Sequence, residues 1–193
     1  MSPVPAGIDV RVRKFLKDGD GRGASTLAIR TLGPQVLRYL GAILRDDEDK
    51  KDAFSRWAES LWRGLPRFRW QSSLRTWALK LAYHAALDLR DQAWRRRETR
   101  LESGEASNIA EAVRTATAVR VERQRSILRE LRQTLTLEEQ ALIGLRVDQG
   151  LAWEEIADVL ARDGDTPDPG TIAKRFERVK ARLGEMLRSE GIV

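Results

Sequence analysis

The chain has 193 residues, of which 41% are hydrophobic and 33% charged, a composition typical of a water-soluble protein with a core and a highly charged surface. Its 35 lysines and arginines exceed 29 acids, giving a net charge of +6 that favours a polyanionic partner. It has no cysteine and one histidine, which excludes a disulfide framework, a typical zinc site and Ser-His-Asp or Cys-His catalysis. We therefore expect no enzyme activity, no cofactor and no metal.

No stretch approaches the 18 to 20 consecutive apolar residues of a membrane span, and residues 1–10 lack the plan of a signal peptide. We expect a cytoplasmic protein without membrane insertion.

Prolines and glycines in residues 1–25 predict a loosely ordered N-terminal extension with one brief helix. From Thr26 onward, leucines and a valine recur at helical spacing, although Gly33-Pro34 should break or restart that helix.

The acidic run from Asp46 to Asp49 predicts the start of a second helix. The apolar residues that this helix should bury are Phe54, Trp57, Leu61, Trp62 and Leu65. After a loop at Pro66, Ser72 or Ser73 can cap a third helix that runs into the basic run at 94–97. These three helices make a first domain over residues 26–97.

Residues 98–122 are small and polar, which is typical of an interdomain linker. A second domain over residues 123–193 should hold four helices, the first carrying Ile127, Leu128, Leu131 and Leu135. Thr136 and Glu139 predict a capping box for the next helix, Gly150 its end, and Asp168-Pro169 the start of the last helix. The predicted fold class is all-α, with two small helical domains joined by a flexible linker.

The last helix carries polar and basic side chains away from its apolar stripe. They are Thr171, Lys174, Arg175, Arg178, Lys180 and Arg182. A short helix and a turn precede it, which is the order of a helix-turn-helix that reads the major groove. Solvated charges on an amphipathic helix would give the same pattern.

Arginines and aromatic residues alternate in RGLPRFRWQSSLRTW, from Arg63 to Trp77. Such a mixture suits unpaired nucleic acid, because aromatic rings stack on exposed bases beside positive charge. Trp57, Trp62 and Trp77 fit the core better, so Trp70 is the candidate for an exposed ring.

Two segments resemble one known family. LGPQVLRYLGAILRDDEDKKDAF, LWRGLPRFR and SLRTWALKLAYHAALDLRDQAWRRR, within residues 26–97, resemble domain two of the extracytoplasmic-function (group IV) sigma factors of the sigma-70 family. LTLEEQALIGLRVDQGLAWEEIADVLARDG and GTIAKRFERVKARL, within residues 125–188, resemble sigma domain four.

The resemblance implies an alternative sigma factor that binds core RNA polymerase, melts the minus-ten promoter element and reads the minus-thirty-five element as duplex. It implies that residues of the helix from Asp49 to Trp62 dock on polymerase, namely Asp49, Asp52, Ser55, Arg56 and Trp62. It implies that the loop from Phe68 and the helix from Leu74 hold a flipped base, with DNA contacts from Arg69, Trp70, Arg75, Lys80, His84 and Arg90. The helix from Thr171 to Leu183 corresponds to the duplex reader, and an anti-sigma factor is a further candidate partner.

The chain departs from the family pattern at several positions. Ser55-Arg56 stands where Gln-Glu is common, His84 where asparagine is common, and Ala152 where a serine cap is usual. The turn ARDGDTPDPG before the last helix is longer than usual.

Other interpretations stay open. A helix-turn-helix repressor would explain only residues 125–193, and a degenerate sigma-like adaptor would bind without melting promoters. A nucleic-acid-processing enzyme would require convergent carboxylates or metal ligands, whereas the acids at 46–49 splay apart at a helix start.

Overall fold

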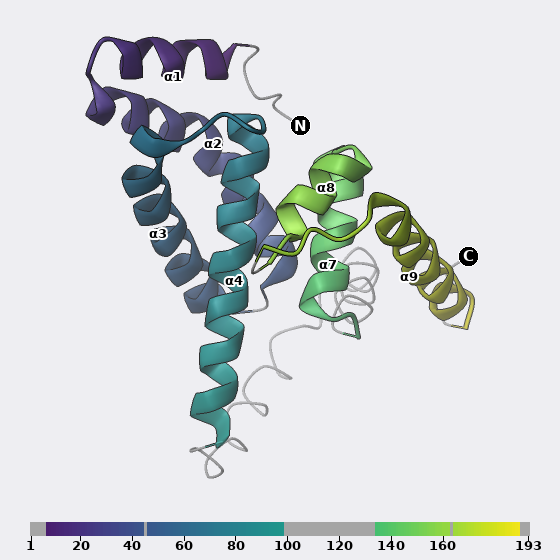
Figure 1. The fold of residues 1–193 in the computed structure, drawn as a ribbon. Helices are drawn as coiled ribbons and strands as arrows, with labels where there is room; N and C mark the ends of the chain where they lie inside the picture. The colour runs from purple at the N-terminus through teal and green to yellow at the C-terminus, as the bar shows by residue number, and fades with distance from the viewer. Residues whose placement is uncertain (1–6, 45, 99–133, 163, 190–193) are drawn as a thin grey trace, which may run out of the picture.

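The computed structural model describes residues 7–44, 46–98, 134–162 and 164–189. Within these ranges the chain forms seven α-helices and two short helical segments and has no strand, which confirms the all-α prediction. We call α1 to α4 the first unit and the elements from α7 onward the second unit (Figure 1).

The N-terminal segment is more regular than the prolines and glycines predicted. It contains α1 (Ile8–Lys17), and α2 (Gly21–Ile43) begins before Thr26. The side chain of Asp20 caps α2 by accepting a hydrogen bond from the Gly23 amide at 2.7 Å. Ile8 and Val12 of α1 are buried, so α1 belongs to the core of the first unit.

The predicted break at Gly33-Pro34 is wrong, because α2 runs through Pro34 without interruption. A proline inside a helix costs about 3 kcal/mol. On both sides of it, Leu32, Val36 and Leu40 are almost completely buried, and burial of three such side chains is worth about 1.5 to 3 kcal/mol each. Tertiary packing therefore holds the helix across a local defect.

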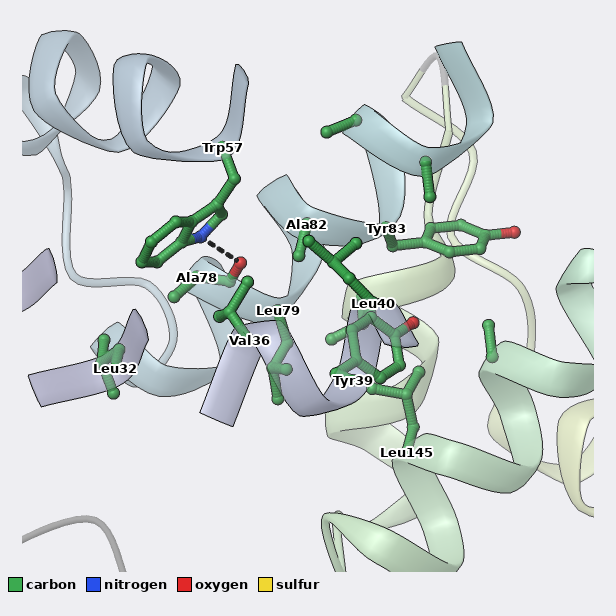
Figure 2. Packing of buried hydrophobic residues seen from close by; sticks show 14 of the residues in the cluster. Leu32, Val36, Tyr39, Leu40, Trp57, Ala78, Leu79, Ala82, Tyr83 and Leu145 are labelled. Carbon is green, nitrogen blue, oxygen red and sulfur yellow. Dashed lines mark hydrogen bonds between the residues drawn. The ribbon is translucent and has the colours of Figure 1, made fainter. Parts of the chain in front are cut away.

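The next two helices begin at the caps that the sequence predicted. Asp46 caps α3 (Asp47–Gly64) by accepting from the amide of Glu48 at 2.6 Å. After the short 3-10 turn η1 (Leu65–Arg67), Ser73 accepts from the Thr76 amide at 3.0 Å in the first turn of α4 (Leu74–Glu98). Trp57 of α3 is fully buried and its indole donates to the Ala78 carbonyl of α4 at 3.0 Å (Figure 2).

The expectation that Trp62 is a core residue is wrong, since 40% of it is exposed on α3. Trp62 directly follows the fully buried Leu61. Adjacent residues on a helix lie about 100° apart, so one of the two has to face outward.

The second unit consists of α7 (Leu137–Ile143), the π-helical segment η2 (Gly144–Asp148), α8 (Trp153–Leu160) and α9 (Pro169–Ser189). Thr136 and Glu139 form the predicted capping box of α7. Gly150 follows with a φ of +65°, a left-handed conformation that suits glycine and reverses the chain after η2. Asp168 caps α9 by accepting from the Thr171 amide at 2.7 Å.

The two units pack on one another. α7 and η2 lie against α2, and α8 lies along α4, with α9 on the outer side (Figure 1). Their buried side chains join one core, in which Tyr39 of α2 lies beside Leu145 of η2 (Figure 2). The predicted helix around Ile127 and the linker beyond Glu98 lie outside the described residues, and the division into two domains stays a prediction.

Candidate nucleic-acid interface

The loop before α4 is built from stacked aromatic rings. Phe68 stacks on Trp77 of α4 with ring centroids 4.5 Å apart, and Trp70 packs against Phe68 at 4.9 Å. Trp70 has a φ of 58°, the one non-glycine residue with positive φ in the described ranges. This conformation costs about 1 to 2 kcal/mol for a residue with a Cβ, so ring contacts must stabilise it.

The expectation of an exposed Trp70 is only partly met. The residue is half-buried, because the guanidinium carbon of Arg13 in α1 lies 4.3 Å from the centre of its ring. This is cation–π geometry. Trp70 therefore already has a stacking partner on one face, supplied by the N-terminal extension.

A cleft of about 390 Å³ opens between this loop and α4. Its lining includes Arg67 and Arg69 from the loop side and Trp77, Lys80 and His84 from α4. A cleft of this size, with positive charge beside aromatic rings, can hold an extruded base with its phosphate. Asp158 of α8 also lines it.

Three of the predicted DNA-contacting residues on α4 are already engaged by the second unit. Arg75 donates to the backbone carbonyl of Gln149 at 2.6 Å, and Lys80 pairs with Asp158 at 3.2 Å. His84 lies 2.9 Å, through its Nε2, from the carbonyl oxygen of Ala161. These side chains act as structural contacts in this arrangement.

The environment of Arg75 is partly desolvated. Burial lowers its pKa from the ordinary value, and the nearby Glu155 carboxylate works in the opposite direction. An arginine stays charged under either influence. Arg90, further along α4, is exposed and lies 3.4 Å from Asp91.

The basic residues of α9 fall into two groups. Lys174 and Arg178 are exposed and make no ion pair with other described residues. Arg175 pairs with Glu138 at 2.9 Å and Arg182 with Glu139 at 2.8 Å, so α7 holds both of these arginines.

The other two polar residues predicted on α9 are also exposed. Lys180 lies 3.5 Å from Glu177, and Thr171 donates its hydroxyl to its own helix cap, Asp168, at 3.1 Å.

Packing fixes α9 against α8. Trp153 of α8 meets Phe176 of α9 edge to face at 5.5 Å, and Arg146 lies 4.3 Å above the Trp153 ring. In the connecting turn, Arg162 and Asp165 exchange two backbone hydrogen bonds. A supporting helix, a turn and an exposed basic helix follow in helix-turn-helix order.

The candidate docking residues lie on α3. Asp52, Ser55 and Trp62 are exposed and Asp49 is half-buried. Arg56 is half-buried and donates to the Gln92 side chain of α4 at 2.9 Å. Arg56 therefore braces α3 against α4 in addition to any outside contact.

Two kinds of feature are not found in the described part of the chain. No group of three or more His, Asp or Glu side chains gathers there as metal ligands. No described helix is both long and apolar enough to cross a membrane.

Sequence reasoning missed Arg13 and the α8 acids Glu155 and Asp158. Arg13 belonged to an extension without a readable role. Glu155 and Asp158 follow the pattern of an ordinary solvated helix face, and only the tertiary contacts distinguish them.

Comparison with known families gives one match. Residues 28–96 match the model of Sigma-70 region 2, a segment that begins in α2 and ends near the end of α4. The matched segment covers about a third of the chain and includes the aromatic loop, the cleft-lining residues of α4 and the whole of α3. No curated protein matches the chain. The family match supports a relationship with the sigma-70 family of sigma factors.

Proposed function

We propose that this protein is an alternative sigma factor of the extracytoplasmic-function group, which binds core RNA polymerase and directs it to promoters. The observation that carries the proposal is the match of residues 28–96 to Sigma-70 region 2. Region 2 suggests a role with RNA polymerase and promoter DNA. An all-α chain with an excess of basic residues agrees with such a role.

The first unit would bind the melted minus-ten strand. The cleft beside Phe68 and Trp77 offers aromatic faces to bases, and the exposed Arg67 and Arg69 offer charge to phosphates. Unstacking a base costs a few kcal/mol, and stacking returns about 1 to 3 kcal/mol for each base.

The second unit would read the minus-thirty-five element as duplex. Lys174 and Arg178 project from α9 without ion-pair partners in the described ranges, which leaves them available for base edges or phosphates.

Docking on polymerase would use α3, whose outward side carries Asp52 and the exposed ring of Trp62 and whose first turn carries the half-buried Asp49. Interface energy concentrates in a few buried anchors, and large aromatic residues are over-represented among them. Trp62 would be such an anchor once polymerase covers it. Ser55 and Arg56 would change the rest of the contact surface on α3.

Binding of single-stranded DNA by the full-length chain tests the first of these roles. Trp70 packs on Phe68, a ring that lines the cleft. Titration with a labelled single strand of mixed sequence should therefore show that Trp70→Ala weakens binding by about 1 kcal/mol, the lower end of what one stacked base contributes. Trp62→Ala, compared at equal folding by circular dichroism, should leave this affinity unchanged because Trp62 lies on α3. If the wild type binds duplex but no single strand, the protein is better described as a helix-turn-helix regulator or a sigma-like adaptor.

A further inference from the structure

We propose that α1 supports the loop formed by residues 68–73 and that Arg13 of α1 is a positioning residue for DNA binding, acting through Trp70. This inference rests on the proposed function, and it gives the N-terminal segment a role at the candidate minus-ten site. Arg13 does not itself touch the base. It holds a ring whose position shapes the cleft.

Two side chains on one face of α1 contact this loop and the helix after it. The guanidinium carbon of Arg13 lies 4.3 Å from the centre of the Trp70 ring. One turn earlier, the carboxylate of Asp9 accepts a long hydrogen bond of 3.5 Å from the amide of Leu74, the first residue of α4. Positions 9 and 13 are four residues apart and therefore share a face of the helix. α1 lies at the end of the first unit where α4 begins (Figure 1).

α1 is itself held firmly, as a support requires. Ile8 and Val12 are buried in the core of the first unit, which fixes the helix by apolar packing. In the turn that leads into α2, the amide of Asp20 donates to the carbonyl of Phe15 at 2.9 Å. Gly19 reaches this turn with a φ of +78°, a conformation that suits glycine. α1 therefore cannot move away from the loop without losing these contacts.

Trp70 depends on support because its backbone is strained. Its φ of 58° lies in the left-handed region, which is sparsely populated by residues with a large side chain. Such residues persist only where their surroundings hold them, and they cluster at functional sites. Two neighbours hold the Trp70 ring, namely Phe68 with ring centroids 4.9 Å apart and Arg13. Of these two, Arg13 comes from outside the loop, so it ties the ring to α1.

The effect of Arg13 reaches the cleft through successive ring contacts. Trp70 packs on Phe68, and Phe68 stacks on Trp77 at 4.5 Å. Phe68 and Trp77 line the cleft, whereas Trp70 and Arg13 lie outside its lining. A substitution at Arg13 therefore alters the surface that a base meets without removing a group that the base touches.

An arginine near a DNA-binding cleft has an alternative role, direct contact with a phosphate, and the two roles differ in salt dependence. Loss of a phosphate contact lowers the slope of log affinity against log salt concentration by about 0.7 for single strands. Loss of a positioning contact lowers the affinity and leaves this slope unchanged, because the side chain displaces no counterion from the DNA. The salt slope therefore separates positioning from phosphate binding.

The test uses the full-length chain and labelled oligo-dA, oligo-dC and oligo-dT strands of about 12 nucleotides, a length within the site size of common single-strand binders. Affinity is measured at several salt concentrations for the wild type, Arg13→Ala, Arg13→Lys, Trp70→Ala and the double variant Arg13→Ala/Trp70→Ala, at equal folding by circular dichroism. Arg11→Ala is the matched control, because Arg11 is exposed on the same helix and lies about 200° around it from Arg13. Amide hydrogen exchange over residues 68–74 is measured in the free protein, with residues 137–143 of α7 as the internal reference.

We expect Arg13→Ala to weaken binding about two- to fivefold at an unchanged salt slope. A cation–π contact at an exposed site shifts an equilibrium by about that factor, and apparent affinity scales with the fraction of molecules whose loop is correctly formed. Arg13→Lys should lose less, because a lysine ammonium can also lie over the ring. The double variant should bind like Trp70→Ala alone, since both substitutions remove the same support.

The control and the exchange measurement complete the expected pattern. Arg11→Ala should change the affinity less than Arg13→Ala does. Exchange over residues 68–74 should be faster in Arg13→Ala than in the wild type, and exchange over residues 137–143 should not change.

Three results overturn the role of Arg13 while leaving the proposed function intact. The first is unchanged exchange over residues 68–74 in Arg13→Ala. The second is a salt slope that Arg13→Ala lowers and Arg11→Ala does not, which would make Arg13 a phosphate contact. The third is a double variant whose loss of affinity equals the product of the two single losses. A wild type that binds none of the strands is different, since it refutes the proposed minus-ten role and leaves Arg13 with no site to position. Faster exchange in Arg13→Ala would then still show that α1 supports the loop.

Discussion

The basic side chains of α9 differ in whether an ion pair holds them. This difference predicts which substitutions weaken DNA binding most. Lys174 and Arg178 are exposed and unpaired with other described residues, whereas α7 holds Arg175 and Arg182 through Glu138 and Glu139. We expect Lys174→Ala and Arg178→Ala to weaken duplex binding more than Arg175→Ala and Arg182→Ala.

The magnitudes follow from the contacts. Loss of a base-reading side chain costs about 1 to 3 kcal/mol, and loss of a phosphate contact lowers the salt slope by about 0.9. Over a fourfold rise in salt, that slope change is worth about 3.5-fold in affinity. DNA can recruit Arg175 only by breaking an exposed ion pair worth about 0.2 to 1 kcal/mol, so Arg175→Ala should cost less by that amount. Conversely, Glu138→Gln should release Arg175 and tighten binding by about 1.5- to 5-fold.

Fluorescence anisotropy with promoter duplex, at several salt concentrations, measures both quantities. Glu185→Gln is the control, because it removes one acid from the exposed surface of α9 without breaking an ion pair to another described residue. The reasoning is refuted if Arg175→Ala is the most damaging of the substitutions, or if Glu138→Gln and Glu185→Gln have the same effect.

Three further predictions concern stability and docking. Tyr39→Phe removes a buried hydroxyl that has no hydrogen-bond partner. The free energy of unfolding, measured by urea titration, should rise by about 1 kcal/mol. A less stable variant would show that the hydroxyl does form a hydrogen bond. Burial raises the pKa of Glu139, but the Thr136 amide and Arg182 outweigh it and hold the pKa below its ordinary value. Its stabilising effect should therefore be complete above the unfolded-state pKa of about 4.3 and disappear as pH falls through the lower folded-state value. The stability difference between wild type and Glu139→Gln should vanish in acid, and a difference that grows there would contradict the assignment. The double variant Ser55→Gln/Arg56→Glu loses the Arg56–Gln92 hydrogen bond, which is worth about 1 kcal/mol of stability. It should still bind core polymerase in titrations. Failure to bind would place Ser55 and Arg56 at the centre of the interface.

Local chemistry made much of the helical framework predictable. Thr136 with Glu139, and Asp168 before Pro169, act through hydrogen bonds within one turn of chain, so the sequence pattern is sufficient to locate them. The all-α class followed from such caps and from apolar spacing.

Features that depend on distant partners were not predictable. Pro34 sits inside α2 because neighbouring helices bury its flanking residues, and Trp62 is exposed because Leu61 already faces the core. Arg13 and Asp158 contact candidate DNA-binding residues that are far from them in the sequence. Arg13 contacts Trp70, and Asp158 contacts Lys80 across 78 positions. No spacing rule within one helix connects such pairs.

Transcription reconstituted from core RNA polymerase of the protein's own host, the purified full-length chain and genomic DNA tests the central claim most directly. The start sites of the transcripts are sequenced with and without the chain. The account predicts that start sites appear only when the chain is present, with shared sequence elements about ten and thirty-five base pairs upstream, and that Lys174→Ala/Arg178→Ala reduces their use. If the chain binds core polymerase but yields no specific start sites, or does not bind it at all, the protein is not a sigma factor.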